Sequence, residues 1–335
     1  MSLVEAWVAD LPKVELHVHH IGATAPHTVA ALAARYPDAG VPSDLDALEQ
    51  FFGFTDFAHF LRVYAAVSRL LRTPEDVYEL TIGNLLDLAR QNVRYAEVTV
   101  TPNGPLACGV PRDGLVEALD AAREHAAREY GLVVGWILDI PGHPGPPAEV
   151  VMDLCEHAPP EGLVALGLGG PETPRPQFAD YFARGRALGL PGIPHAGEAA
   201  GPASVRAAVE DLHAVRIGHG TRAMEDPRVV ALLRERAVHL EVCPTSNVRT
   251  RVVDTLEEHP LPAMLAAGLE VSISSDDPPM FGTTLTEELL VAARLVGANE
   301  VPTLLGNAID ASFAPNDVKR RYRSELRRAP GPAVP

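Results

Sequence analysis

The stretch "KVELHVHHIG" (residues 13–22) begins as a short apolar strand and ends in a group of three histidines. Successive side chains of a strand point to opposite faces, so His17 and His19 share one face. Two imidazoles placed in this way are typical of a metal site, although hydrogen-bonded core histidines are the ordinary alternative. The other strands of the chain decide between these two interpretations.

Seven further apolar runs follow, and segments with helical spacing separate them. The eight predicted strands are residues 14–19, 94–100, 133–140, 163–169, 192–197, 216–220, 239–244 and 270–275. Apolar strands that alternate with helices are typical of parallel strands buried on both faces. Eight of them favour an α/β fold of the closed (β/α)8 type, the TIM barrel.

No linker-like stretch divides the chain, so we expect a single domain over residues 1–328. Residues 23–92 are longer than a barrel connection requires and predict extra helices, inserted after the first strand and lying over the mouth of the barrel. In this insertion, Thr73 is the predicted N-cap of a helix with Pro74 at its first position. The last segment, residues 329–335, predicts a disordered tail.

Composition limits the partners that this chain of 335 residues can bind. A formal charge of −16 argues against nucleic acid or an anionic membrane surface. We expect neither a signal peptide nor a membrane span, because no uncharged apolar run approaches roughly 20 residues. Cys108, Cys155 and Cys243 include no C-x-x-C pair, which favours reduced thiols in a cytoplasmic protein. The sequence makes no prediction of oligomeric state.

Polar residues gather where the predicted strands end. The motifs are "LGGPE" (168–172), "HAGE" (195–198), "RIGHG" (216–220), "CPTSN" (243–247) and "SSDDPP" (274–279). Each has an ordinary explanation when taken alone: a core histidine for His195, a tight turn at His219, and a helix cap for Asp276 and Asp277. Active sites of (β/α)8 barrels lie at the carboxyl ends of the strands, and the convergence of these motifs there favours a metal site.

Three imidazoles and a carboxylate are ligands that suit Zn²⁺, with Fe²⁺, Mn²⁺ or Co²⁺ as alternatives. Such an ion generates a nucleophile from water near neutral pH. Glu198 and His219 remain for the proton transfers of hydrolysis. Two-metal sites often use a modified lysine on the fourth strand, and this chain has no lysine between Lys13 and Lys319. We therefore expect one metal ion per chain.

Together, these motifs resemble those of the adenosine deaminase family, in the family's order and over essentially the whole chain. The resemblance implies a metal-dependent hydrolase that removes the 6-amino group of a purine nucleoside as ammonia and leaves a 6-oxopurine. Its implied ligands for a single Zn²⁺ are His17, His19, His195 and Asp276.

The same resemblance implies roles for the other motif residues. Glu198 would protonate purine N1, and His219 would orient and deprotonate the attacking water. The backbone N–H of Gly170 would bind N3, and a protonated Asp277 would donate to N7. Ser246 and Asn247 would support these groups from behind.

The chain departs from the family at Ile21, where an aspartate that binds the 5′-hydroxyl of the ribose is usual. The H-H-[VI]-G pattern resembles the aminodeoxyfutalosine deaminases of menaquinone biosynthesis, whose substrate carries a carboxyphenyl-ketone chain at the 5′ carbon. Ile21 and the phenylalanines of the insertion (Phe52, Phe54, Phe57 and Phe60) would suit this arm. His20 would bind its ketone or carboxylate, or lie solvated at the rim.

Alternatives to this substrate stay open at this point. Ile21 could be a neutral change with a neighbour covering the hydroxyl, which would leave an adenosine, 5′-modified adenosine or adenine deaminase of purine salvage. The second alternative is another mononuclear amidohydrolase, acting on a lactone or cyclic amide; the missing bridging lysine and the motif "LGGPE" argue against it. The third class of protein left open is a degenerate barrel that binds a ligand without catalysing a reaction.

Overall fold

A computed structural model describes residues 2–329 and 331 of the chain. Its described part holds eight parallel strands, which pair in the order of the sequence. Their bounds are β1 Lys13–His19, β2 Val93–Val100, β3 Val133–Ile140, β4 Leu163–Leu168, β5 Gly192–Ala196, β6 Arg216–His219, β7 His239–Val242 and β8 Val271–Ile273. Each strand overlaps the run predicted for it, and the predicted (β/α)8 barrel is confirmed.

The sheet closes through Asp276, which follows β8. The backbone N–H of Asp276 donates to the carbonyl of His17 (2.9 Å), and the N–H of His19 donates to the carbonyl of Asp276 (2.9 Å). This bridge pairs Asp276 with Val18 of β1 in parallel. Asp276 has a φ of +65°, a left-handed conformation that is uncommon outside glycine and persists at sites where the surroundings impose it.

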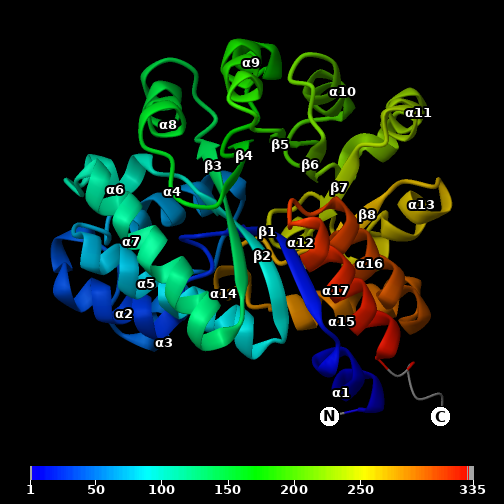
Figure 1. Cartoon of the computed structure of the whole chain (residues 1–335), viewed down its shortest axis with the longest axis horizontal. Coiled ribbons are helices and arrows are strands. Elements are labelled where there is room, and N and C mark those ends of the chain that lie inside the picture. Colours follow the sequence, from blue (N-terminus) through cyan, green and yellow to red (C-terminus); the bar gives the residue numbers. More distant parts are fainter. Residues whose placement is uncertain (1, 330, 332–335) are drawn as a thin grey trace.

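Helices surround the strands (Figure 1). Up to β4 they are α1 Leu3–Asp10, α2 Pro26–Arg35, α3 Leu45–Phe51, α4 Phe57–Ser68, α5 Pro74–Arg90, α6 Asn103–Ala107, α7 Arg112–His125 and α8 Pro146–His157. After β4 they are α9 Ala179–Ala187, α10 Pro202–Glu210, α11 Pro227–Arg236, α12 Pro244–Arg249, α13 Leu261–Ala266, α14 Pro278–Phe281, α15 Leu285–Val296, α16 Val301–Ala311 and α17 Asn316–Arg328. Among the described residues, no helix is both long and apolar enough to cross a membrane.

The long connection between β1 and β2 contains α2 to α5. Thr73 caps α5 as predicted: its Oγ1 accepts the backbone N–H of Asp76 (3.2 Å), and Pro74 occupies the first helical position. Helix α5 packs against β2 and α7, as an outer helix of the barrel does, whereas α4 packs against α6 (Figure 1). Because α6 follows the carboxyl end of β2, α4 is the part of the predicted insertion that reaches the mouth of the barrel. Most of the predicted tail, residues 329–335, lies outside the described residues.

A buried ion network crosses the interior of the barrel. Arg216, at the start of β6, lies between Glu97 of β2 and Glu241 of β7, and donates to both carboxylates. Its third contact is a hydrogen bond from Nη1 to the carbonyl of Ala311 (2.8 Å). An unpaired buried charge is strongly unfavourable, so the guanidinium and the two carboxylates depend on each other.

Candidate active site

Side chains from separate strand ends meet at the carboxyl end of the barrel. His19 Nε2 lies 3.1 Å from His195 Nε2 and 3.3 Å from Asp276 Oδ1. His17 Nε2 lies 3.5 Å from the same carboxylate oxygen, is buried, and has no hydrogen-bond partner among the described residues. Ligands about 2.1 Å from a tetrahedral ion lie about 3.4 Å apart. These three spacings, which together link all four predicted ligands, are of the size that a metal ion of this kind requires.

His219, at the end of β6, is part of the same cluster. One group of ligand atoms within 4.8 Å of one another contains His17, His195, His219 and Asp276, and a second contains His19, Asp276 and Asp277. His219 Nε2 lies 3.6 Å from Glu198 Oε2 and 3.8 Å from Asp276 Oδ2. This position next to a carboxylic acid and the cluster suits the proton-transfer role predicted for His219.

Hydrogen-bond partners on the Nδ1 side of His195 and His17 fix the orientation of these two rings. His195 Nδ1 donates to the carbonyl of Leu168 (3.1 Å), which can only accept, so Nε2 carries the lone pair. His17 Nδ1 contacts Glu241 Oε2 (3.0 Å). Burial disfavours the charge of Glu241, but Arg216 and His17 outweigh it and lower its pKa to about 2. A carboxylate behind an imidazole orients the ring and increases its basicity toward a metal.

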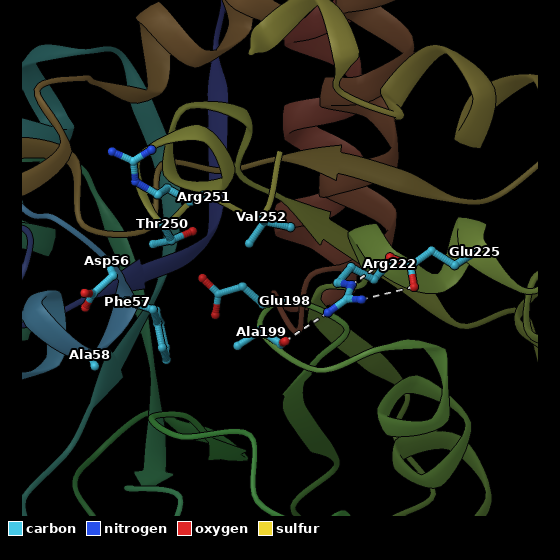
Figure 2. Close-up of a pocket in the computed structure, with 10 residues that line it drawn as sticks. All are labelled: Asp56, Phe57, Ala58, Glu198, Ala199, Arg222, Glu225, Thr250, Arg251 and Val252. Carbon is cyan, nitrogen blue, oxygen red and sulfur yellow. Dashed lines mark hydrogen bonds and ion pairs between the residues drawn. The ribbon is translucent and has the colours of Figure 1, made fainter. Parts of the chain in front are cut away.

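The loop after β5 holds Glu198 through a second glutamate, Glu172 of the "LGGPE" motif. The Glu172 carboxylate accepts four hydrogen bonds, from the backbone N–H groups of Gly197 (2.9 Å), Glu198 (2.7 Å) and Ala200 (3.0 Å) and from Ser204 Oγ (2.5 Å). On the other side, Arg222 donates to the carbonyl of Ala199 (3.0 Å), as Figure 2 shows. The loop is thus fixed where Glu198 enters the cavity.

Burial, together with the charges of Asp276 and Glu172, raises the pKa of Glu198 well above its usual value. A carboxyl group that keeps its proton near neutral pH can act as a general acid. Burial and the neighbouring Asp276 likewise raise the pKa of Asp277. Its Oδ1 has no partner among the described residues, and it occupies space that Gly22 leaves open, where a Cβ would lie 1.5 Å away.

Two cavities open from this centre. The larger, about 700 Å³, is lined by His19, His195, His219, Glu198, Asp276, Asp277 and Gly170, and continues between α4 and α6. The smaller, about 580 Å³, lies beyond Phe57 and contains Asp56, Arg222, Glu225 and Arg251. Glu198 and Phe57 border both cavities, and Figure 2 shows them facing the smaller one.

Two residues predicted to contact the substrate lie behind the cavity wall. His20 is 2% exposed and its Nε2 contacts Thr81 of α5 (2.7 Å), so the alternative of a solvated rim residue is wrong. Ile21 is 1% exposed and packs in the hydrophobic core. Neither is among the residues that line the larger cavity. Side chains alternate along β1, so the direction that brings His19 inward turns His20 outward toward α5.

Ser246 and Asn247 lie behind the groups they were predicted to support. Ser246 Oγ donates to Asp276 Oδ2 (2.6 Å). Asn247 contacts His219 Nδ1 (3.2 Å) and accepts a hydrogen bond from Thr221 (2.9 Å). These contacts favour the predicted positioning roles.

Asp139, at the end of β3, is a residue of the site that was not predicted from the sequence. This side chain is 2% exposed, lines the larger cavity, and has no partner for Oδ1 among the described residues. Burial raises its pKa to about 6. Gly167 and Gly169 make room for it, because a Cβ on either would lie within 2.7 Å of a carboxylate oxygen. An aspartate at the end of the apolar run "VVGWILDI" was the available signal.

Tyr64 of α4 is the second missed residue. Its buried hydroxyl faces the larger cavity and makes no hydrogen bond within the described residues. The ring stands edge-on to His19, with 6.3 Å between the ring centroids. A buried hydroxyl normally finds a partner, so Tyr64 offers a hydrogen bond to a ligand. Only the fold, which brings α4 over β1, reveals this.

A parallel barrel with buried histidines and carboxylates at the carboxyl ends of its strands is that of a metal-dependent hydrolase. The chain belongs to the adenosine deaminase family, whose sequence profile matches residues 12–329. Members of this family depend on a metal and hydrolyse C–N bonds, so the prediction of an enzyme of this class is confirmed.

Similar proteins support this classification. The aminodeoxyfutalosine deaminase of Streptomyces avermitilis is 49% identical over 330 residues, which cover 96% of this chain and 92% of that protein. A crystal structure of adenine deaminase from Arthrobacter aurescens has a TM-score of 0.88 at 33% identity and covers 95% of this chain and 98% of its own. A crystal structure of an amidohydrolase from Burkholderia ambifaria with bound Zn has the same TM-score at 27% identity. The match covers 98% of this chain and 92% of that chain.

Proposed function

We propose that this protein is the hydrolytic deaminase of aminodeoxyfutalosine, converting the 6-aminopurine into a 6-oxopurine with release of ammonia. The observation that carries the proposal is the buried His/Asp cluster with Glu198 beside it, at the base of a cavity of about 700 Å³. A pocket of this size suits a ligand larger than a bare base. The 49% identity to the Streptomyces avermitilis enzyme over nearly the whole chain supports this choice of substrate.

We further propose a single Zn²⁺ per chain, held by His17, His19, His195 and Asp276. The orphaned Nε2 of His17 and the spacing of the other ligand atoms support this set. When bound, the ion would lower the pKa of a coordinated water to about 7 and so supply a nucleophile at neutral pH. Metal analysis of protein purified without chelators should find one equivalent, and two equivalents per chain would contradict the proposal.

The chain's own groups then carry the proton transfers. Glu198 gives a proton to N1, which removes the aromaticity of the ring and exposes C6 to attack by water. His219 accepts the proton from the attacking water. The N–H of Gly170 binds N3, where a side chain would crowd the base, and Gly170 adopts a φ of +68°. Protonated Asp277 donates to N7. Water adds at C6, His219 passes the proton it took from the water to the amino group, and ammonia leaves as the new C6 hydroxyl group returns a proton to Glu198.

A deaminase of adenine is the second candidate, because the Arthrobacter aurescens structure shares the fold at 33% identity. The cavity beyond the metal centre favours a nucleoside with a 5′ substituent, since adenine would leave most of it empty. Ammonia release should be measured from aminodeoxyfutalosine, adenosine, 5′-methylthioadenosine and adenine. We expect the highest kcat/KM with aminodeoxyfutalosine. A higher value with adenine would overturn the choice of substrate but leave the deaminase class intact.

We also propose that the enzyme works in the cytoplasm. Its three cysteines are free thiols in the structure, and free thiols persist in a reducing compartment. Separating the cytoplasmic fraction of the source cells and following the deaminase activity would test this location.

A further inference from the structure

The larger cavity runs along one face of α4. Apart from Arg62, the residues of α4 that line it recur at intervals of three and four: Phe57, Phe60, Leu61, Tyr64, Ala65 and Ser68. Residues at this spacing form one side of a helix. Asn103, Gly104 and Ala107 of α6 form the opposite wall, where Gly104 comes close to Ser68. The cavity is thus an apolar channel that leads away from the metal centre between two helices.

Charge is distributed unevenly along this channel. All the carboxylates that line it, those of Asp139, Glu198, Asp276 and Asp277, come from the strand ends around the metal centre. The lining charges at α4 are the guanidinium groups of Arg62, on the helix, and of Arg69, which directly follows its last residue, Ser68. These two arginines are seven residues apart, so they lie on the same side of the helix, about 10 Å from each other along its axis.

Neither guanidinium has an ion-pair or hydrogen-bond partner among the described residues. Other arginines of this acidic chain do pair, as Arg35 does with Asp76 and Arg184 with Glu156. Arg62 and Arg69 are exposed at the channel. Two exposed, unpaired cations on the wall of an apolar channel match a ligand with an apolar body and an anionic end group.

We propose that the 5′ substituent of the substrate lies in this channel between α4 and α6, and that Arg62 and Arg69 bind its carboxylate. This inference rests on the proposed function, and it assigns the specificity for the 5′ arm to α4. The smaller cavity is the other exit from the site, but Asp56 and Glu225 line it. Of its two arginines, Arg222 is already paired with Glu225, and Arg251 donates to the carbonyl of Thr55. Its carboxylates would repel an anionic arm.

The test compares substrates that differ only at the end of the arm. kcat and KM are measured for aminodeoxyfutalosine, for its methyl ester and for 5′-methylthioadenosine, with the metal-loaded protein and the variants Arg62→Gln, Arg69→Gln and the double substitution. Arg294→Gln is the matched control. Arg294 is also exposed and has no ion-pair or hydrogen-bond partner among the described residues, but it lies on α15, away from the cavity.

We expect the double variant to lose at least about tenfold in kcat/KM for aminodeoxyfutalosine, the effect of one charge-assisted hydrogen bond. The loss should fall on KM, because a contact remote from the reacting atoms binds substrate and transition state alike. The methyl ester and 5′-methylthioadenosine should change less than about twofold, as should all three substrates with Arg294→Gln.

Equal losses on charged and uncharged substrates would overturn the inference, since they would indicate a structural role. An unchanged KM for aminodeoxyfutalosine in the double variant would overturn it as well. A wild-type protein that deaminates 5′-methylthioadenosine or adenine but not aminodeoxyfutalosine would instead refute the proposed function, so the two failures are distinguishable.

Discussion

Replacing Asp139 by asparagine should stabilise the substrate-free protein at neutral pH. Burial raises the pKa of this carboxyl group from 3.8 to about 6 in the folded state. The folded state therefore binds more protons than the unfolded state between about pH 4 and pH 6, and its stability falls as the pH rises through this range. At about 1.4 kcal/mol for each pKa unit, the full penalty is about 3 kcal/mol. Asparagine has the same shape and does not ionise.

The assay is urea unfolding of the wild type and Asp139→Asn between pH 4.5 and pH 7.5. Between pH 4.5 and pH 7.5, the unfolding free energy of the variant should rise by about 2 kcal/mol relative to that of the wild type. The rest of the penalty of about 3 kcal/mol develops below pH 4.5. Metal-free protein should show the full effect, because a nearby dication would lower the pKa of Asp139 and reduce the difference. Asp211→Asn, at an exposed aspartate, controls for the change in net charge. Parallel curves for wild type and Asp139→Asn would refute the reasoning.

Three further substitutions test other parts of the site. Glu198→Gln should retain the metal and lower kcat by about 10²–10⁴-fold; near-normal ammonia release would exclude Glu198 as the acid. Arg216→Met should lower the free energy of unfolding in urea by about 3–5 kcal/mol, because two buried carboxylates lose the guanidinium group that neutralises them. A loss below about 1 kcal/mol would contradict this. Gly218→Ala would place a Cβ 2.6 Å from His17 Cε1. In a competition titration, this variant should bind the metal about 10–100-fold more weakly than the wild type. The control is Gly83→Ala, where the nearest atom to the new Cβ is 3.8 Å away, and it should bind the metal as the wild type does.

The barrel was predictable because parallel strands covered on both faces are continuous apolar runs. The run "VVGWILDI" matches β3 at both ends, residues 133 and 140. The longest mismatch is at β8, where "EVSISS" (270–275) begins one residue before Val271 and continues two residues past Ile273. Glycine, proline and polar residues marked the other strand ends. The order of strands then required only that sequential elements pack side by side.

The candidate site was predictable where one residue type at a strand end carries the chemistry, as at His195 and Asp276. It was not predictable where function depends on contacts between distant segments. The room for Asp139 is made by glycines on the next strand, and Tyr64 reaches the cavity from a helix whose position no local pattern gives. His20 is an error of the opposite kind, a predicted substrate contact that the structure does not show. The alternation of side chains along β1 turns His20 away from the cavity, toward Thr81.

Asp276 contributes its carboxylate to the candidate metal site and its backbone to the closure of the barrel. This double use has a consequence for the order of events during synthesis of the chain. When His219 has left the ribosome, every histidine of the cluster is available, but β1 still has an open edge. A metal ion captured then would meet imidazoles without the carboxylate that completes the set. Arrival of residue 276 seals the sheet and completes the ligands together, so an amino-terminal fragment that stops short of it would have neither a closed fold nor a working site.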